Sequence, residues 1–423
     1  MSDRLLGNAI GWSEKLESRK TIVYIGGFEL PDKNAAAQRV IANGKILRTL
    51  GFNVVYVGID KTLQPNFNIL DTKKNHFGFE SWSISYPSSK FEWIKHLTSI
   101  RQLKLLFIYY GYENLKAIIC YNYPAIAQLK VQSLCRRNKV ACVADATEWY
   151  GSSGAGFLFK LIKWLDTTLR MRYVHSRADG IITTSNFLSD FYKSSGKPIV
   201  ELPTLYDKEL LDVIPKISRT NHNDIIYFTY AGSPFNASRA KNEKRSIKER
   251  MDLVIKLMFS LCQQNIKFEL NIYGVTNEDY CGVYLEDISK LEIMKDCVNF
   301  HGRKSHAEIL TSIKSSNFTV YFRDIDRVTI AGFPSKFAES ISCGIPVITN
   351  RTSNIDSYIK ASEIGVFVEL DEEEKWLREI SVVLMRGGSA IHKLQQNCEQ
   401  YVGFDYRTYV SQVGHFFERV TLK

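Results

Sequence analysis

The residues with the most specific chemistry in this sequence lie in the segment 332–349. Pro334 can begin a helix without losing a needed hydrogen-bond donor, and the free N–H groups of a first helical turn attract anions. Ser335 and Lys336 add a hydroxyl and a positive charge at the same point, which favours a diphosphate. Glu339 follows one turn later, where its carboxylate can accept hydrogen bonds from two adjacent ribose hydroxyls. These residue types at this spacing predict a nucleotide-diphosphate site.

A turn, a helix and a strand are expected to position this site. Gly332 and Phe333 precede the helix, and Gly344 can end it because glycine readily adopts the left-handed backbone conformation. Residues 345–348 are apolar and short enough for a buried strand. A helix followed directly by a buried strand is typical of α/β proteins.

The first half of the chain alternates apolar strands with segments of helical length. A strand at 22–25 is followed by a turn at Gly26 and Gly27 and by a helix that begins near Ala35. Further strands are expected at 52–57, 117–121, 140–144 and 180–184. Strands that alternate with helices form a parallel sheet, so we expect an α/β fold with a doubly wound first domain.

The alternation stops in a polar, proline-containing region and then restarts. A second Rossmann-like domain is predicted by strands at 225–231, 268–273, 299–302 and 318–322 and by a helix at 248–263. The expected division is a first domain at 1–210, a linker at 211–222, a second domain at 223–400 and a C-terminal helix at 401–423 that packs back on the first domain. Ligands of such sheets bind beyond the carboxyl ends of the strands, so we expect the active site in a cleft that the two domains face.

The positive charge of the chain is unevenly distributed. The net charge is +10, and residues 1–210 hold 28 Lys and Arg against 18 Asp and Glu, whereas the remainder holds 27 of each. A basic half indicates nucleic acid, an anionic membrane surface or an acidic substrate, and no nucleic-acid-binding motif accompanies the charge. The segments 89–112 and 157–177 mix cationic and large apolar residues. They read either as interfacial helices or as core helices with a solvated basic face.

The sequence lacks recognisable targeting and membrane-spanning signals, which predicts a cytoplasmic location. No apolar run approaches the roughly 20 residues of a spanning helix, and the N-terminus lacks a signal-peptide core. We therefore expect a cytoplasmic protein that is peripheral on the inner face of the cell membrane, with its eight cysteines reduced.

Motifs from both halves of the chain are loose individually, but their order and spacing together are specific. The first half contributes the Gly26-Gly27 turn, the Asp145-Ala-Thr-Glu148 segment and the 178–185 strand, and the second contributes the His301-Gly302-Arg303 turn and the 332–349 segment. With these motifs the chain resembles retaining glycosyltransferases of the two-Rossmann (GT-B) type, family four. It is most similar to bacterial enzymes that build capsule, O-antigen and related surface polysaccharides.

The resemblance implies a donor site with one departure. The family signature has two glutamates separated by seven residues; Glu339 matches the second, which holds the nucleotide ribose, but Ala331 stands at the first. Asp324, Asp326 or the nearby backbone replaces the missing glutamate, or the sugar is held differently. The resemblance also implies a basic pair for the diphosphate, with Lys248 near the lysine position. Donor binding is expected at Gly27, Gly232, Ser233, Lys248, Arg303, Arg323, Gly332, Phe333, Pro334, Ser335, Lys336 and Glu339.

Several residues have competing interpretations. Asp145 and Glu148, at the end of a predicted strand, are candidates for acid/base catalysis or acceptor binding together with Lys248, although Asp145 could instead cap the following helix. The basic insertion 235–247 is either a solvated loop or a lid over the phosphate. His301 and His306 are expected to be structural.

The sequence favours an enzyme that needs no cofactor and no metal. Asp324 and Asp326 imitate a metal-binding pair of another glycosyltransferase fold. Cationic side chains and a helix terminus can instead neutralise the charge of the phosphates, so no metal is needed. We expect a retaining glycosyltransferase that moves a sugar from a nucleotide-diphosphate donor, a UDP-sugar by family precedent, to a lipid-linked or nascent polysaccharide acceptor. The alternatives are a nucleotide-sugar epimerase of the same fold and a catalytically silent sugar-binding protein.

Overall fold

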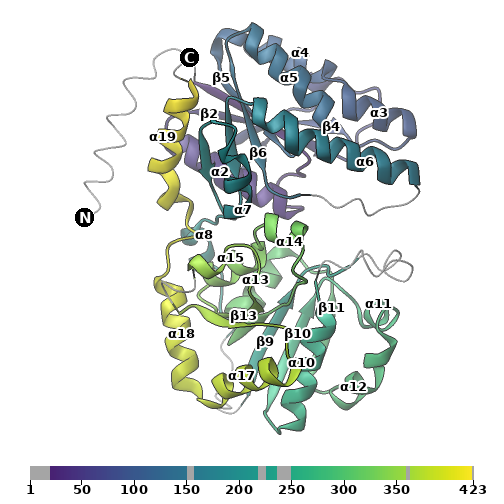
Figure 1. Cartoon of the computed structure of the whole chain (residues 1–423), viewed down its shortest axis with the longest axis vertical. Coiled ribbons are helices and arrows are strands. Elements are labelled where there is room, and N and C mark those ends of the chain that lie inside the picture. Colours follow the sequence, from purple (N-terminus) through teal and green to yellow (C-terminus); the bar gives the residue numbers. More distant parts are fainter. Residues whose placement is uncertain (1–19, 150–156, 218–224, 236–248, 359–362, 422–423) are drawn as a thin grey trace. The chain divides into compact units, whose positions relative to one another are not determined.

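The computed structural model describes residues 20–149, 157–217, 225–235, 249–358 and 363–421. Contacts divide the chain into two compact units (Figure 1). Unit 1 comprises Met1–Leu205, Ala331–Phe333 and Tyr406–Lys423, and unit 2 comprises Tyr206–Ile330 and Pro334–Asp405. The chain therefore passes into unit 2 at Tyr206, before the predicted boundary at residue 210.

Unit 1 is built on an eight-stranded sheet in the order β3-β4-β2-β1-β5-β6-β7-β8. Its strands are β1 (Thr21–Gly26), β2 (Asn53–Asp60), β3 (Lys74–His76), β4 (Phe79–Ser85), β5 (Leu115–Tyr121), β6 (Ala141–Ala146), β7 (Gly180–Thr183) and β8 (Ile199–Glu201). Only β3 runs antiparallel to its neighbour among these strands. The helices of unit 1 are α2 (Ala35–Thr49), α3 (Lys90–Thr98), α4 (Arg101–Tyr110), α5 (Ala125–Arg137), α6 (Phe157–Leu169), α7 (Asn186–Lys193) and α19 (Val410–Thr421).

Side chains that alternate along β1 separate the two faces of this sheet. Ile22 and Tyr24 join the apolar cluster that contains residues of α2 and α19. Val23 and Ile25 join the opposite cluster, which contains residues of α4 and α5. Because successive side chains of a strand point to opposite faces, an apolar run such as this one is buried on both sides. Unit 1 is a doubly wound domain, as the sequence predicted.

The C-terminal segment returns to unit 1. A turn follows α18, and the chain then forms a short helical turn at Tyr406–Tyr409 and helix α19, which lies beside α2 (Figure 1). Phe417 of α19 packs on Phe52 with their ring centroids 5.8 Å apart. Only part of the segment predicted at 401–423 is helical, since Val410 is the first residue of α19.

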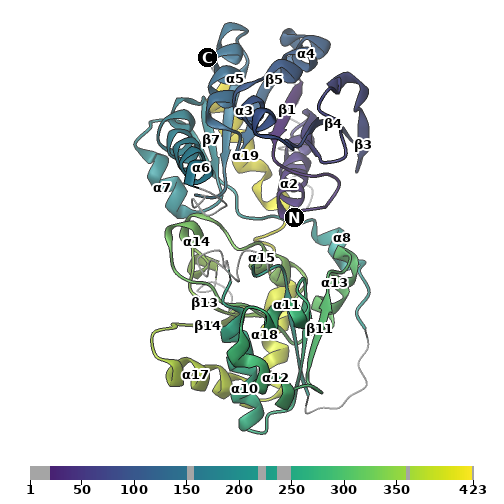
Figure 2. The same ribbon diagram turned by 90° about the vertical axis from the view of Figure 1, so that its right-hand side faces the viewer.

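Unit 2 contains a six-stranded sheet in the order β11-β10-β9-β12-β13-β14, with every pair parallel. Its strands are β9 (Ile226–Ala231), β10 (Phe268–Tyr273), β11 (Val298–Gly302), β12 (Phe318–Val320), β13 (Val347–Asn350) and β14 (Gly365–Val368). Its helices are α8 (Lys208–Asp212), α10 (Met251–Gln263), α11 (Asn277–Cys281), α12 (Ile288–Ile293), α13 (His306–Lys314), α14 (Arg327–Ala331), α15 (Ser335–Ser342), α17 (Glu373–Met385) and α18 (Gly388–Gln400). Helices α10 and α17 lie side by side (Figure 2).

Helix α15 ends in a backbone motif at Gly344, as the sequence predicted. Gly344 has a φ of 79°, and its N–H donates to the carbonyl of Ile341, while the N–H of Ile345 donates to that of Ser340. Both bonds are the signature of a left-handed helix end. Because the cap uses the Ile345 N–H, strand β13 begins at Val347 rather than at the predicted residue 345.

The two segments read either as interfacial helices or as core helices with a solvated basic face contain several exposed apolar side chains. Helix α3 has no buried residue among those described, and Phe91 is 64 % exposed. Trp164 of α6 is 51 % exposed, while Trp93 of α3 contacts Phe159 of α6 with ring centroids 6.1 Å apart. Within the described ranges, no helix has the length and apolar character needed to cross a membrane.

The return of α19 can be tested by truncating its central aromatic side chain. Phe417 is 2 % exposed, so Phe417→Ala should lower the free energy of unfolding by about 3–5 kcal/mol, measured by urea denaturation. Glu418→Ala changes an exposed neighbour on the same helix and should cost less than about 0.5 kcal/mol. Equal effects of both substitutions would contradict this packing.

Candidate functional site

The carboxyl ends of three strands of unit 2 meet at closely packed glycines. Gly232 follows β9 and donates its N–H to the Tyr273 carbonyl at 2.9 Å, and Gly274 follows β10 and donates to the Gly302 carbonyl at 2.7 Å. Any side chain at Gly274 would collide with the backbone of Gly232. These glycines therefore let the strand ends approach one another at the edge where parallel sheets bind ligands.

Lys336 lies directly against Gly232. A Cβ atom at Gly232 would collide with the end of the Lys336 side chain, and the φ of 148° at Gly232 also disfavours other residues. The Lys336 ammonium is 4.3 Å from the centroid of the Tyr230 ring. The structure thus brings together Gly232 and Lys336, which are separated by more than a hundred residues in the sequence.

A buried carboxylate, Glu249, joins two of the predicted cations. The Glu249 carboxylate forms ion pairs with the Lys336 ammonium and, at 3.1 Å, with the Arg323 guanidinium, and it accepts a 2.7 Å hydrogen bond from the Tyr230 hydroxyl. Burial alone raises the pKa of Glu249, but the charges of Lys336 and Arg323 outweigh it and lower the pKa to about 2. Glu249 is therefore ionised at neutral pH.

Helix α15 begins next to these charges. Pro334 is its N-cap residue, and no described side chain caps its first turn. Lys336 is the second residue of the helix, so its ammonium and the amino end of α15 belong to one positive region. Pro334 lies just before the helix rather than inside it, and the use of Pro334, Ser335 and Lys336 for a diphosphate stays a prediction.

Glu339 lies one turn into α15 and is largely buried. Its Oε1 atom is 2.8 Å from His306 Nε2 and 3.4 Å from the Tyr206 hydroxyl, whose oxygen also lies 3.4 Å from the Ser335 carbonyl. The sequence reading left both carboxylate oxygens free for a ribose, whereas the structure engages Oε1. His306, which was expected to be structural, contacts the carboxylate predicted to bind the ribose, and a hydrogen bond of this kind is compatible with a structural role.

The remaining donor candidates are scattered. Arg303 is exposed after β11, and the Ser233 hydroxyl is 3.4 Å from the Gly274 carbonyl. Gly27 follows β1 and belongs to unit 1, as do Gly332 and Phe333. Lys248 and almost all of the insertion at 235–247 lie outside the described residues.

Asp145 takes part in a buried ion pair rather than a helix cap. It is the fifth residue of β6 and is fully buried; its Oδ1 atom is 2.9 Å from the Arg39 guanidinium, and Oδ2 accepts a hydrogen bond from the Tyr24 hydroxyl. The same guanidinium donates to the Leu202 carbonyl at 2.8 Å. Both charges are therefore satisfied within unit 1.

Glu148 lies just beyond β6 and is partly buried. Burial and then the charge of Glu148 raise the pKa of Tyr121, so the Glu148 carboxylate acts on this phenol. Asp145 and Glu148 are thus close in sequence but occupy different surroundings, since only Asp145 pairs with Arg39.

Glu249 and Tyr230 are the residues that sequence reasoning missed. A single glutamate between Lys248 and Arg250 looks like one member of a mixed charge run, and such runs are usually solvated. The sequence feature that could have identified Glu249 is the apolar helix that begins at Met251, because a residue just before a buried helix lies at the border of the core. Tyr230, inside an aromatic strand, gave no sign of a polar role.

Asp324 and Asp326, whose spacing imitates a metal-binding pair, both have partners within the protein. Asp324 pairs with Arg250 at 3.0 Å, and the Asp326 carboxylate accepts a 2.8 Å hydrogen bond from the Thr329 N–H in the first turn of α14. Among the described residues, no group of three or more His, Cys, Asp or Glu is arranged to hold a metal ion.

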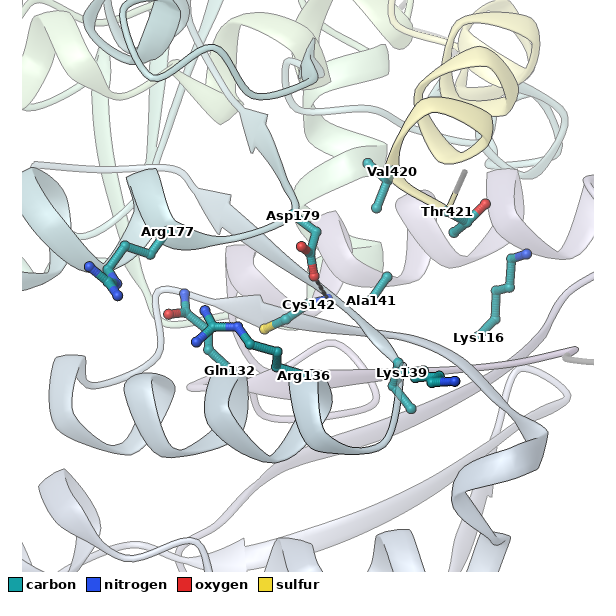
Figure 3. A pocket seen from close by; sticks show the side chains of 11 residues that line it. Lys116, Gln132, Arg136, Lys139, Ala141, Cys142, Arg177, Asp179, Val420 and Thr421 are labelled. Carbon is teal, nitrogen blue, oxygen red and sulfur yellow. Dashed lines mark hydrogen bonds between the residues drawn. The ribbon is translucent and has the colours of Figure 1, made fainter. Parts of the chain in front are cut away.

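Unit 1 has a concavity at the amino ends of β5, β6 and β7. Its volume is about 720 Å³, and Lys116, Arg136, Lys139 and Arg177 contribute to its wall (Figure 3). Asp179 also lines it and accepts a 2.9 Å hydrogen bond from the Cys142 N–H. Part of the positive charge of the first half is thus gathered at the strand ends opposite to those that carry Gly27 and Asp145.

The role of Asp145 can be tested by removing its charge alone. Asp145→Asn leaves Arg39 buried without its counter-ion and should destabilise the protein by about 3–5 kcal/mol. Thermal or urea unfolding measures this change, and Asp71→Asn on the exposed surface of unit 1 serves as the control. An Asp145→Asn variant with wild-type stability would show that the ion pair does not support the fold.

The comparisons with known proteins agree with this architecture. Residues 243–402 match the family model of glycosyl transferases group 1, whereas no curated protein sequence matches the chain significantly. The chain is similar to sucrose-phosphate synthase from Thermosynechococcus elongatus, with 13% identity, a TM-score of 0.66 and coverage of 95% of this chain and 99% of the other. It is also similar to the catalytic domain of starch synthase IV from Arabidopsis thaliana bound to ADP and acarbose, with 10% identity, a TM-score of 0.64 and coverage of 96% and 100%.

A third similar structure is the HepE protein of Anabaena in complex with UDP-glucose, with 13% identity, a TM-score of 0.58 and coverage of 94% of this chain and 99% of the other. At such low identities these likenesses show the fold, which is the two-domain GT-B fold that the sequence predicted. The family match of residues 243–402 adds an observation from the sequence itself. Together, the family model and the shared fold support a GT-B glycosyltransferase.

Proposed function

We propose that the protein transfers a sugar from a nucleotide-diphosphate donor, that unit 2 binds this donor, and that unit 1 binds the acceptor. The observation that carries the proposal is the positive region at the amino end of α15, where Lys336 and Arg323 lie beside closely packed strand ends. Glu339, one turn into the same helix, is within reach of a ribose bound there. These residues lie inside the segment that matches the family model.

The proposed chemistry is stabilisation of a leaving diphosphate. In this proposal Lys336, Arg323 and the helix terminus stabilise the negative charge that increases as the sugar leaves. Cations held in a partly buried site stabilise this charge more strongly than solvated ones, since water screens them less. We propose that these groups serve without a metal ion or cofactor and that the sugar configuration is retained, which is the mechanism implied by the family resemblance.

A uridine nucleotide and a surface-polysaccharide acceptor are the favoured substrates. The similar HepE protein is described in complex with UDP-glucose, and another similar structure is a lipopolysaccharide outer core galactosyltransferase, matched with a TM-score of 0.57. The acceptor we propose is therefore lipid-linked or nascent polysaccharide. The basic first half of the chain suits an acceptor that carries phosphate or acidic sugars.

Helices α3 and α6 form the surface through which we propose peripheral binding to the inner face of the cell membrane. Phe91 and Ile94 of α3 and Ile162, Trp164 and Leu165 of α6 are all between 40 % and 64 % exposed. Exposed aromatic and aliphatic side chains interleaved with lysines are typical of helices that lie in a membrane interface. Arg170, grouped with this surface in the sequence, is instead buried and donates to the Asn122 carbonyl at 2.9 Å.

Donor binding can be tested by a thermal-shift screen of nucleoside diphosphates and nucleotide sugars. A selective ligand at about 100 times its dissociation constant should stabilise the protein by about 2.7 kcal/mol. Glu339→Ala should abolish this shift, because it removes the carboxylate placed for the ribose. Glu292→Ala, at an exposed site of the same unit, should retain it.

A shift that survives Glu339→Ala would remove Glu339 from the donor site. Transfer or hydrolysis of isotope-labelled donor then separates the enzyme from its alternatives. Binding without turnover of any donor would indicate a sugar-binding protein, and interconversion of the donor's sugar would indicate an epimerase.

Membrane binding can be tested by flotation with liposomes that contain anionic lipids. Trp164→Ser together with Ile162→Ser should reduce the floated fraction, because two exposed apolar anchors are lost. Ile293→Ser changes an apolar residue of unit 2 that is even more exposed and should leave flotation unchanged. Flotation that is insensitive to the α6 changes would contradict a membrane surface on α6.

A further inference from the structure

We propose that Glu249 is a positioning residue, which holds Lys336 and Arg323 as a fixed pair of cations for the phosphates of the donor. This role rests on the proposed function, since it concerns the same site. Glu249 itself is not expected to touch the donor, because a carboxylate repels phosphate. It acts through the two side chains that it pairs with.

The geometry assigns one cation to each carboxylate oxygen. Oε1 of Glu249 is 3.1 Å from the Arg323 guanidinium, and Oε2 pairs with the Lys336 ammonium and accepts the hydrogen bond of Tyr230. The carboxylate therefore fixes the spacing of two positive groups that come from the end of β12 and from α15. Without it, a lysine side chain loses much of its preference for one rotamer.

The surroundings of Glu249 make this arrangement stiff. Its side chain is 4 % exposed and that of Arg323 is 7 % exposed, so water screens their interaction little. The backbone of Arg323 is itself held by Asn350, whose side chain accepts from the Arg323 N–H and donates to the Arg323 carbonyl, both at 2.9 Å. Lys336 is fixed from the other side by Gly232 and by the Tyr230 ring.

The charge balance also favours a positioning role. Glu249 carries one negative charge and its two partners carry two positive charges, so it does not offset both cations beside the amino end of α15, which itself favours anions. The opposite possibility is that Glu249 occupies the place of the phosphate and competes with it for Lys336. The two roles predict opposite effects of neutralising Glu249, because a competitor weakens binding and a positioning residue strengthens it.

The test compares UDP with uridine, because the difference between their affinities isolates the phosphate contribution. Isothermal titration calorimetry of Glu249→Gln should show UDP binding weakened about tenfold or more, with uridine binding unchanged within about twofold. Glu249→Asp keeps the charge on a shorter side chain and should give an intermediate loss. Asp287→Asn is the matched control, since Asp287 is also a buried carboxylate of unit 2 paired with a lysine and a tyrosine hydroxyl.

Each outcome decides the proposal. Unchanged or tighter UDP binding by Glu249→Gln would overturn it, and so would an equal loss in Asp287→Asn, which would indicate a general effect on the fold. If Glu249→Gln does not fold, unchanged UDP binding by Glu249→Asp would overturn the proposal. Failure of the wild-type protein to bind UDP, ADP or GDP would instead refute the proposed function itself.

Discussion

The parallel arrangement of the strands is the constraint on which the rest of this structure depends. Apart from the β3–β4 pair, all strand pairs of both sheets are parallel. Parallel neighbours require crossover connections, and the helices in those connections must cover both faces of each sheet. A central strand such as β1 is therefore apolar on both sides, and the residues of the proposed donor site lie at strand ends.

The two units use their carboxyl edges in different ways. In unit 1 the carboxylate of Asp145 is neutralised by Arg39 deep in the core, so this charge holds the domain together. In unit 2 the carboxylate of Glu249 is also buried, but its partners Lys336 and Arg323 belong to a positive region at a helix terminus. The same kind of interaction is thus structural in one unit and organises the proposed donor site in the other.

The close approach of the backbone at Gly232 and Gly274 makes the arrangement around Glu249 possible. Gly274 packs on Gly232, and Gly232 leaves the space that the Lys336 side chain fills. Any larger residue at Gly232 would push the ammonium away from Glu249 and from the helix terminus. The glycines are therefore needed for the electrostatics of the site as much as for its backbone conformation.

Much of the fold could be predicted from the sequence, because it depends on residue types that are close together along the chain. The apolar strands, the glycine that ends α15 and the cationic helix start all follow from residue types at fixed spacing, and the two-domain α/β fold follows from their alternation. Predicted element ends were less accurate where another part of the chain uses a backbone group. Helix α10 begins at Met251 rather than at the predicted residue 248, and the Arg250 N–H just before it donates to the Phe322 carbonyl.

Only the tertiary structure decided which side chains pair. Asp145 and Arg39 are 106 residues apart, and Glu249 and Lys336 are 87 residues apart, so no local pattern could join them. His306 and Glu339 are likewise brought together only by the fold. The sequence by itself determined the two parallel sheets and the start of helix α15, because periodicity and turn chemistry are local. Folding decided the charge partners, because burial and pairing depend on which distant strand ends meet.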